Sequence, residues 1–361
     1  MIFINYKKEG DLTMKCKSKL LLLPASILLL TGCGASANTS IPRGYTPIDK
    51  ADPAARQAFF DKVGDDIALT YAKGVQGFLA EGSFNLKEFS LTQTRADNKV
   101  NSIKLANLKA DYSFGLVGLN EGASKAKAMI KVENLGFKLN YVVQGKEYAL
   151  NASDLDAAAY FVDNTLYYDL SDKDVKNFVN DAIDFSYAIN EKSDKTERIA
   201  EDKKEAEKYL GKYFLKDNDE VEDVADSIPS ALTSSEIVTI KSAVKSAFEA
   251  VLAEDKVKDL LTLSEDKNSK GAAIALALTS EPVEVDSGKV SGDLKASLVF
   301  DKEGLFSRFG FEGNADVSVK YDNPEKIVCK INKLDFGANF KYGSNVVKMP
   351  SFKDYVAFPN N

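Results

Sequence analysis

Two long blocks of the chain alternate apolar and polar side chains with a period of two residues. One block runs from Ser83 to Ser171, and the other runs from Ala272 to about Val347. Such alternation puts every second side chain on the same face of a β-strand, and it is typical of an antiparallel sheet with one apolar face. A large part of the chain is therefore expected to form such a sheet.

Several stretches show the pattern clearly. The stretch "ANLKADYSFGL" places on one face Leu108, Ala110, Tyr112, Phe114 and Leu116. The stretch "LGFKLNYVV" does the same with Leu135, Phe137, Leu139, Tyr141 and Val143. "AYFVDNTLYYDL" predicts a hairpin that turns at Asp163-Asn164, because this residue pair favours a tight turn. A second hairpin is predicted to turn at residues 301–304, "DKEG".

Helical signals separate the two blocks and precede the first. Asp52 can cap a helix whose first residue is Pro53, so a helix is expected over 53–73. "SDKD" begins a second helix at Ser171, and a third is expected from Ser234 to about Leu263. The strongly charged residues 190–226 are expected to form either a solvated helix or a mobile excursion.

These elements predict an α+β fold. A strongly twisted, half-barrel-like antiparallel sheet is expected to pack on a central group of helices. Residues 52–361 are expected to form a single domain with a helical insertion at about 171–265.

The N-terminus carries an apolar run from Leu20 to Leu30. A membrane-spanning helix needs about 20 apolar residues, so this run is too short for one. It suits the central region of a signal peptide, and lysines at 15, 17 and 19 supply the positive charge that precedes such a region. Residues 1–32 are therefore predicted to be a signal peptide, with Met14 as the true start.

Leu30-Thr31-Gly32-Cys33 resembles the lipobox of bacterial lipoproteins, in which small residues precede an invariant cysteine. The resemblance implies cleavage before Cys33 and a diacylglyceryl group on its sulfur. Each buried methylene contributes about 0.8 kcal/mol, so two or three acyl chains anchor firmly. The protein is then expected at the cell membrane, lipid-anchored on the extracytoplasmic face. The alternative is a buried cysteine that ends an ordinary secretory signal.

Residues 33–51 are expected to form the lipidated tether. The stretch that follows Cys33 is small, polar and interrupted by Pro42 and Pro47, which predicts a flexible segment that holds the domain off the membrane. Removal of residues 1–32 takes away five lysines and two acids, so 42 basic and 52 acidic residues remain and the net charge changes from −7 to −10. That charge argues against nucleic acid or an anionic bilayer as a broad electrostatic partner.

The chain has no histidine. This excludes Ser-His-Asp and Cys-His catalysis and the usual transition-metal sites. No catalytic residue, metal site or cofactor is predicted, and the protein is not expected to be an enzyme. Because Cys16 lies in the signal peptide and Cys33 is lipidated, Cys329 has no disulfide partner and is expected to be a small core residue.

One loop resembles a calcium site only at its start. "DKNSKGA" (266–272) begins with a suitable spacing of oxygen ligands, but Ala277 stands where a bidentate glutamate is needed. A polar turn between a helix and a strand is the expected structure.

The apolar sheet face is the one feature large enough to bind a ligand. Its candidate ligand-contacting residues are Tyr112, Phe114, Phe137, Leu139 and Tyr141. Two interpretations remain open. Helices can cover this face and make it a filled core, or the concave face can leave room for an acyl chain or another apolar ligand. Both demand the same alternation.

The order of elements behind a lipobox resembles that of half-barrel lipoproteins similar to the periplasmic lipoprotein carrier. "DNTLYYDLSD" (163–172) and "DKEGLFSRFGF" (301–311) are similar to paired strands in such proteins. The resemblance implies a groove for lipids or acylated ligands. The charged segment 190–226 departs from that pattern, and no binding residue is carried over from the family.

The expected function is a non-enzymatic binding or carrier module for an apolar ligand. The alternative is a surface structural or protein-interaction lipoprotein with a filled core, and a third hypothesis is an envelope hydrolase that uses carboxylates. The expected partners are the membrane, through the N-terminal lipid, and a lipid or other apolar ligand. The sequence does not specify an oligomeric state.

Overall fold

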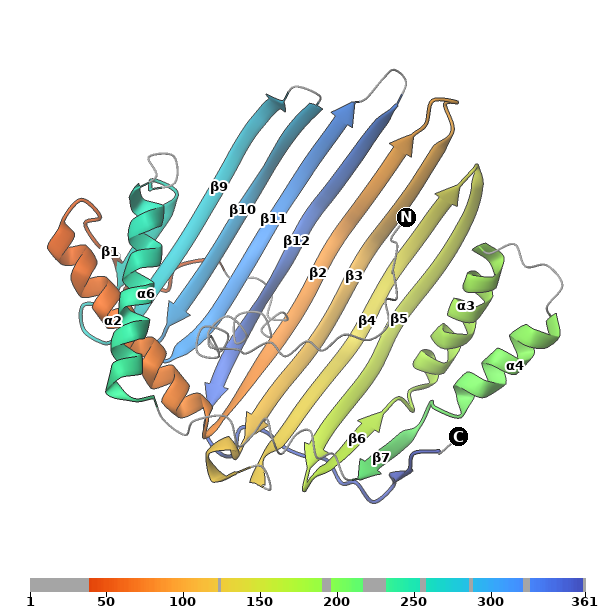
Figure 1. Cartoon of the computed structure of the whole chain (residues 1–361), viewed down its shortest axis with the longest axis horizontal. Coiled ribbons are helices and arrows are strands. Elements are labelled where there is room, and N and C mark those ends of the chain that lie inside the picture. The colour runs from red at the N-terminus through yellow and green to blue at the C-terminus, as the bar shows by residue number, and fades with distance from the viewer. Residues whose placement is uncertain are drawn as a thin grey trace, which may run out of the picture. The chain divides into compact units, whose positions relative to one another are not determined.

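One sheet of 13 strands runs through the described part of the chain (Figure 1). The order across the sheet is β1-β8-β9-β10-β11-β12-β2-β3-β4-β5-β6-β7-β13, so the sheet is open and not closed into a barrel. Neighbouring strands are antiparallel except β13, which is parallel to β7. The predicted antiparallel sheet is confirmed.

The computed structural model describes residues 39–122, 125–189, 196–216, 232–253, 258–285, 288–320 and 325–359. Contacts group Cys33–Asn361 into one unit that is separate from Met1–Gly32. Met14, the rest of the predicted signal peptide and the predicted lipidation residue Cys33 lie outside the described residues. Residues 190–195 and 217–226 of the charged segment, and 227–231 after it, also lie outside them.

Long strands form the middle of the sheet and short strands form its edges. The strands are β1 (Thr46–Pro47), β2 (Gly77–Thr94), β3 (Val100–Val117), β4 (Lys127–Val143), β5 (Lys146–Val162), β6 (Thr165–Asp169), β7 (Lys212–Lys216), β8 (Leu261–Glu265), β9 (Ala272–Val285), β10 (Gly288–Phe300), β11 (Phe306–Lys320), β12 (Lys326–Tyr342) and β13 (Val356–Ala357). The helices are α2 (Pro53–Gly74), α3 (Lys173–Ile189), α4 (Thr196–Glu207) and α6 (Ser234–Ala253), with a 3-10 turn, η1 (Leu119–Glu121). Short edge strands limit pairing with another chain.

The predicted start of the first helix is confirmed, whereas the second helix begins at Lys173 with Asp172 as its cap and not at Ser171. The Asp52 side chain accepts a hydrogen bond from the Ala54 amide at 2.9 Å, and Pro53 is the first residue of α2. The Asp172 side chain accepts hydrogen bonds from the amides of Asp174 at 2.8 Å and Val175 at 3.2 Å. Both caps satisfy amides that the first helical turn leaves without partners.

The two predicted hairpins are also present. Asp163 and Asn164 have φ angles of 50° and 57°, and they join β5 to β6. Gly304 has a φ of +84° in the turn between β10 and β11. Positive φ at both central residues is what a two-residue turn with the twist of the flanking strands requires.

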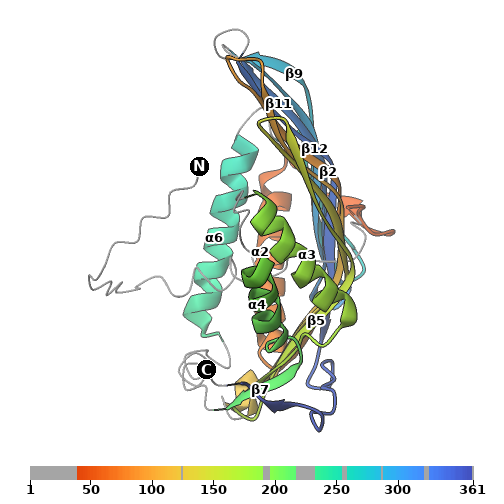
Figure 2. The ribbon, with the colours of Figure 1, turned by 90° about the vertical axis from the view of Figure 1, so that its right-hand side faces the viewer.

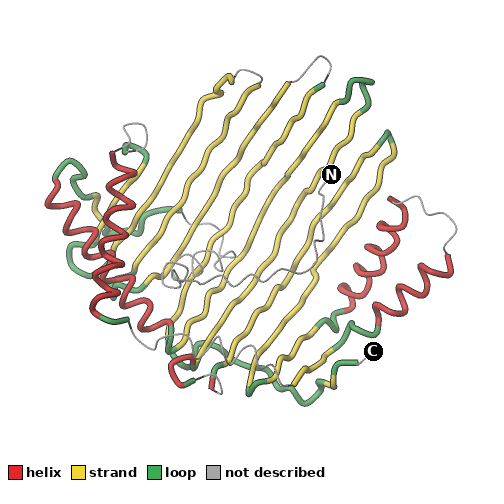
Figure 3. The backbone as a smooth tube through the Cα atoms, in the orientation of Figure 1, coloured by secondary structure: helices red, strands yellow, loops and turns green. Residues whose placement is uncertain are grey.

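The helices form two pairs, and the prediction of one central group is wrong. Phe60 of α2 stacks on Phe248 of α6 with ring centroids 5.6 Å apart, while Lys203 of α4 pairs with Asp184 of α3 at 2.6 Å. Figure 3 shows the pairs at the two lateral ends of the sheet. The reason is connectivity: α3 follows β6 and α6 precedes β8, and these strands lie toward opposite ends of the sheet order.

The largest core cluster lies where α2 packs on the sheet. Phe60 is fully buried, and Phe59 and Leu263 are each 1% exposed. The opposite face of the sheet is covered near β5 and β6 by the C-terminal segment, in which Phe352 stacks on Tyr167 with centroids 3.9 Å apart. The first cluster joins α2 and α6 to β2 and β8–β12, and the second joins the C-terminal segment to β2 and β4–β6.

Residues 39–51 are not a free tether, so the prediction of a flexible 34–51 segment is wrong for them. Thr39 Oγ1 donates to a Glu312 carboxylate oxygen at 2.6 Å, and the Ile48 amide donates to the Leu263 carbonyl at 2.9 Å. β1 pairs with β8 and makes one edge of the sheet. These partners are more than 200 residues away in the chain, so no local pattern shows them.

The third predicted helix is too long. α6 ends at Ala253, and residues 261–265 form β8. Leu261 and Leu263 are both buried in the sheet, whose two-residue spacing they follow. The turn at 266–271 therefore joins two strands, β8 and β9, and not a helix and a strand as expected.

Candidate apolar binding face

The apolar alternation changes phase in the middle of the central strands. In β3 the apolar positions are odd-numbered at Ile103 and Leu105, and even-numbered at Leu108 and Tyr112. Asn107 lies between the two runs with a φ of 53°. A residue in the left-handed region forms a bulge, and the bulge lets both runs point to the same side of the sheet.

The phase changes fall within a few residues of one another in the register of neighbouring strands. Left-handed φ angles of 52–55° occur at Asn134 of β4, Asp154 of β5 and Lys333 of β12 as well as at Asn107. In β2 the change falls at Lys87, which the strand register places between Lys333 and Asn107. We call this row the crease, and it comprises Lys333, Lys87, Asn107, Asn134 and Asp154.

Cross-strand neighbours show that the apolar side chains on both sides of the crease share one face. Tyr112 lies opposite Val132, and Val132 lies opposite Ala157. Leu155 lies two residues before Ala157 in β5, on the same side of the sheet. It packs with Phe137, which lies on the other side of the crease along β4. We call the shared surface of β9–β12 and β2–β5 the apolar face.

All four helices lie on the side of the apolar face, and the sheet curves around that side (Figure 2). α2 and α6 pack against the part of the face between the crease and the strand ends at Phe78 and Leu116, which we call the near half. The part between the crease and the hairpin tips at Thr94 and Val100 is the far half.

One continuous row of apolar side chains crosses the far half. Each member lies directly opposite the next in the strand register. This far row comprises Val283, Val290, Val317, Cys329, Leu91, Ile103, Tyr141 and Tyr148. Val283 is 55% exposed, and Leu91 and Ile103 are 36% and 37% exposed. An aligned, partly exposed apolar row of this kind is a candidate interaction surface.

The five ligand-contacting residues expected from the sequence all have side chains on the apolar face. Tyr112 and Phe114 lie in the near half, and Phe137, Leu139 and Tyr141 lie in the far half. Phe137 meets Phe178 of α3 with centroids 5.7 Å apart, so a helix covers part of that residue. Phe114 packs beside Phe78, with centroids 5.5 Å apart, and only Tyr112 of the five is buried, at 7% exposed.

The opposite face of the sheet is polar in the far half. Lys104 pairs with Glu88 at 2.8 Å, and Lys330 pairs with Asp316 at 2.8 Å, each between neighbouring strands. At the crease the Asn134 side-chain amide donates to an Asp111 oxygen at 2.9 Å. A cleft of about 390 Å³ opens there between lysine side chains of β2, β3 and β12. The two faces of the far half therefore differ sharply in polarity.

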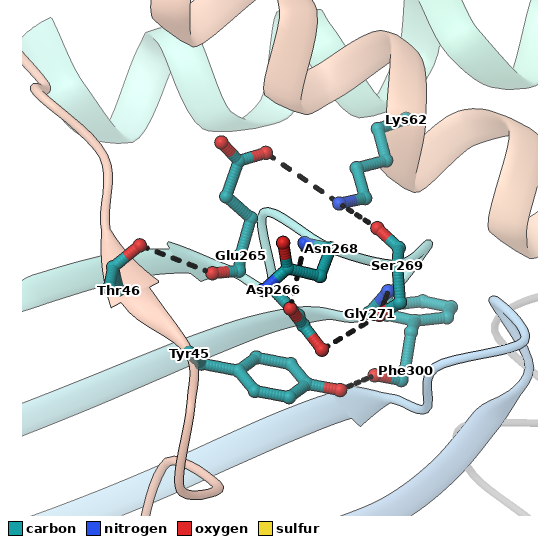
Figure 4. Close-up of polar contacts among 9 residues, drawn as sticks. All are labelled: Tyr45, Thr46, Lys62, Glu265, Asp266, Asn268, Ser269, Gly271 and Phe300. Carbon is teal, nitrogen blue, oxygen red and sulfur yellow. Dashed lines mark hydrogen bonds and ion pairs between the residues drawn. The ribbon is translucent and has the colours of Figure 1, made fainter.

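The loop that resembles the start of a calcium site is a hairpin turn whose aspartate accepts hydrogen bonds from residues of the same turn (Figure 4). Asp266 accepts hydrogen bonds from the Asn268 amide and the Ser269 hydroxyl, each at 2.9 Å. These bonds hold the pKa of the Asp266 carboxyl below its usual range. Tyr45 Oη donates to the Phe300 carbonyl at 2.7 Å and fastens the N-terminal segment beside the turn. The Asp266 carboxylate is thus used to shape the turn.

Asp66 of α2 is the buried carboxyl that sequence reasoning missed. It is 2% exposed, and its Oδ2 has no hydrogen-bond partner among the described residues. A Cβ at Gly304 would lie 2.3 Å from Asp66 Oδ1, so the β10–β11 turn sits directly against this carboxyl. Burial raises the pKa of Asp66 to about 7, although Lys62 and Lys270 oppose the shift. An aspartate inside an otherwise apolar helix stripe was the available signal.

In the described residues, no helix is long and apolar enough to span a bilayer. Across the same ranges, no group of three or more cysteine, aspartate or glutamate side chains is placed to hold a metal ion.

A comparison of the chain with known protein-family models finds no match, and no curated protein matches it at a significant level.

Proposed function

We propose that the protein is a lipid-anchored extracytoplasmic lipoprotein that binds an apolar ligand, such as an acyl chain, on the apolar face, without catalysing a reaction. In this proposal Cys33 carries the membrane anchor, and the open, half-barrel-like sheet holds the ligand on its concave side. The ligand covers the far row, in which Leu91, Ile103, Val283 and Val290 are each more than a third exposed.

The far row is the observation that carries the proposal. Six of the ten exposed large hydrophobic side chains of the described residues lie on the apolar face: Leu91, Ile103, Ile130, Leu278, Val283 and Val290. Exposed apolar side chains scattered singly need no explanation, but a contiguous row on one concave face does. Covering it removes apolar area from water, which favours binding by about 25 cal/mol per Å².

Ligand binding can be tested with the chain of residues 33–361 carrying Cys33→Ser, which keeps every described element. Native mass spectrometry after purification and titration with a fluorescent fatty acid should both show a bound acyl ligand. Ile103→Glu places a charge in the far row and should weaken binding at least tenfold, because an uncompensated charge against an apolar chain is costly. Val356→Glu, at a 57% exposed position on β13, is the matched control and should bind normally.

Failure of the wild-type chain to bind any acyl ligand would reject the proposal. Capture of a protein partner that Ile103→Glu abolishes would instead favour the surface-interaction alternative. The hydrolase hypothesis gains little support, because the Asp266 carboxylate is engaged in its own turn and Asp66 is enclosed between α2 and the Gly304 turn.

The anchor has a separate test. Cys33→Ser in the full chain should move the protein from the membrane fraction to the soluble fraction after its signal peptide is removed. A protein that remains with membranes after cleavage would contradict the lipidation proposal and leave the ligand proposal untouched.

A further inference from the structure

Tyr112 stands out within the apolar face because of its hydroxyl group. Its ring lies in the near half between Gly82 on β2 and Val132 on β4, and the residue is only 7% exposed. Ala110 and Phe114 flank it along β3. Every side chain around this ring in the sheet is apolar, so packing alone would be served as well by phenylalanine.

The hydroxyl of Tyr112 has no hydrogen-bond partner among the described residues. Native proteins satisfy the large majority of buried side-chain polar atoms, and an exception calls for an explanation such as a missing ligand. A phenol can donate a hydrogen bond to a carbonyl or carboxylate oxygen. The position is therefore suited to a ligand that brings one oxygen acceptor into an apolar surrounding.

The surface beyond Tyr112 is suited to the rest of such a ligand. Ile103, in the far row, lies nine residues before Tyr112 on β3, which corresponds to about 30 Å along a strand. The intervening side chain Leu105 points to the same face. In the other direction Phe114 packs against Phe78, and Phe78 packs against the α2 core cluster. Ile130, opposite Phe114 on β4, is 52% exposed.

We propose that Tyr112 Oη donates a hydrogen bond to the acyl carbonyl or carboxylate oxygen of a bound fatty acyl ligand long enough to span the roughly 30 Å between Tyr112 and the far row. Its chain runs along β2 and β3, and its methyl end lies at the far row. This proposal rests on the proposed function and adds the ligand class, its orientation and its polar contact. Free fatty acids and acyl esters share the recognised oxygen.

Affinity measurements on Tyr112→Phe test the hydrogen bond. The variant keeps the ring and should bind a fatty acid and its methyl ester about tenfold more weakly, the effect of one lost hydrogen bond. Its affinity for an alkane of equal length should not change. A loss for the acid alone identifies a free fatty acid as the ligand source, and an equal loss for acid and ester identifies the acyl carbonyl as sufficient.

Tyr168→Phe is the matched control. Tyr168 on β6 also has a buried hydroxyl without a partner among the described residues. Its ring lies on the same side of the sheet but three strands away from β3, where it packs against Tyr213 and Phe358. It should bind all three probes like the parent chain. Unchanged acid and ester affinity in Tyr112→Phe would overturn the proposal while leaving the proposed function standing. Absence of binding of every probe to the parent chain would reject the proposed function itself.

Photo-crosslinking tests the orientation. A fatty acid with a diazirine near its methyl end should label peptides that contain Leu91, Ile103 or Cys329. The same acid with the diazirine near its carboxyl end should label the peptide that contains Tyr112. The reverse assignment, or identical labelling by both probes, would overturn the proposed orientation.

Discussion

The near and far halves of the apolar face consist of the same kinds of side chain on the same strands, yet they differ in what covers them. In the near half Phe60 of α2 is fully buried and stacks on Phe248 of α6. In the far half Leu91 and Ile103 remain 36% and 37% exposed. Strand alternation creates an apolar face, and the position of the helices decides which part of that face becomes core and which part stays exposed.

The largest expected difference between the halves is in stability. Phe60→Ala should lower the free energy of unfolding by about 3–5 kcal/mol, because it leaves a cavity between α2, α6 and the sheet. Leu91→Ala should cost less than about 1 kcal/mol, since the leucine is already partly in water. Chemical denaturation of both variants measures the contrast. Equal losses would show that the far half is packed like the near half.

The near half also contains the carboxyl that should make stability depend on pH. The pKa of Asp66 is about 7 in the folded chain and about 4 in the unfolded chain. At a pH between these two values the folded chain keeps the Asp66 proton and the unfolded chain releases it. Stability should therefore fall as pH rises from 5 to 8, by about 3 kcal/mol. The chain has no histidine, so no side chain of that type titrates in this window.

The measurement is the unfolding free energy as a function of pH for the parent chain, Asp66→Asn and Asp65→Asn. Asp66→Asn should flatten the profile between pH 5 and 8. Asp65, which is largely exposed and pairs with Lys241 at 2.6 Å, supplies the control and should keep the slope. A parent chain with no slope would contradict the buried, unpartnered state of Asp66.

Much of the sheet could be predicted from the sequence because the strand signal is local. Alternation identified the long strands, and Asp163-Asn164 identified a hairpin from two residues. The phase change was also present in the sequence, since Ile103 and Leu105 are odd-numbered whereas Leu108 is even-numbered. An asparagine such as Asn107, which tolerates a positive φ, between two alternating runs of opposite phase is the pattern that would have predicted the crease.

The cover of the sheet could not be predicted because it depends on distant contacts. Thr39 bonds to Glu312, and the Leu263 carbonyl accepts from the Ile48 amide, across more than 200 residues. Five candidate ligand residues were placed on one face correctly, but nothing local distinguishes buried Tyr112 from the more exposed Tyr141. That difference arises from packing between strands and helices, which alternation does not encode.

The crease that joins the two halves can be tested at Asn134. Asn134→Val should destabilise the protein by about 2 kcal/mol, because a β-branched residue is strained at a φ of 55° and the hydrogen bond to Asp111 is lost. Asn134→Gly also loses that exposed hydrogen bond but accepts the φ angle, so it should cost under about 1 kcal/mol. Thermal unfolding compares the two, and equal shifts would mean that backbone strain is not the cause.

The smallest expected effect is a kinetic one, and it probes the far half without altering it. Cys329 is a half-buried free thiol in the far row between Val317 and Leu91, and it is the one cysteine left in the 33–361 chain with Cys33→Ser. A bound acyl chain that covers the far row should slow its alkylation by a factor of about ten when the free ligand is at ten times its dissociation constant.

A thiol placed in the near half provides the contrast. In a chain with Cys329→Ala and Ala338→Cys, the new thiol would occupy a fully buried position under α2, where alkylation is limited by opening of the core and not by the ligand. Its rate should be slow without ligand and should change little when ligand is added, beyond any general stabilisation by binding. Alkylation of Cys329 that proceeds at the same rate with saturating ligand would place the acyl chain away from the far row, even if binding itself is tight. Protection confined to Cys329 would show that the two halves differ in function because helices cover one and leave the other to the ligand.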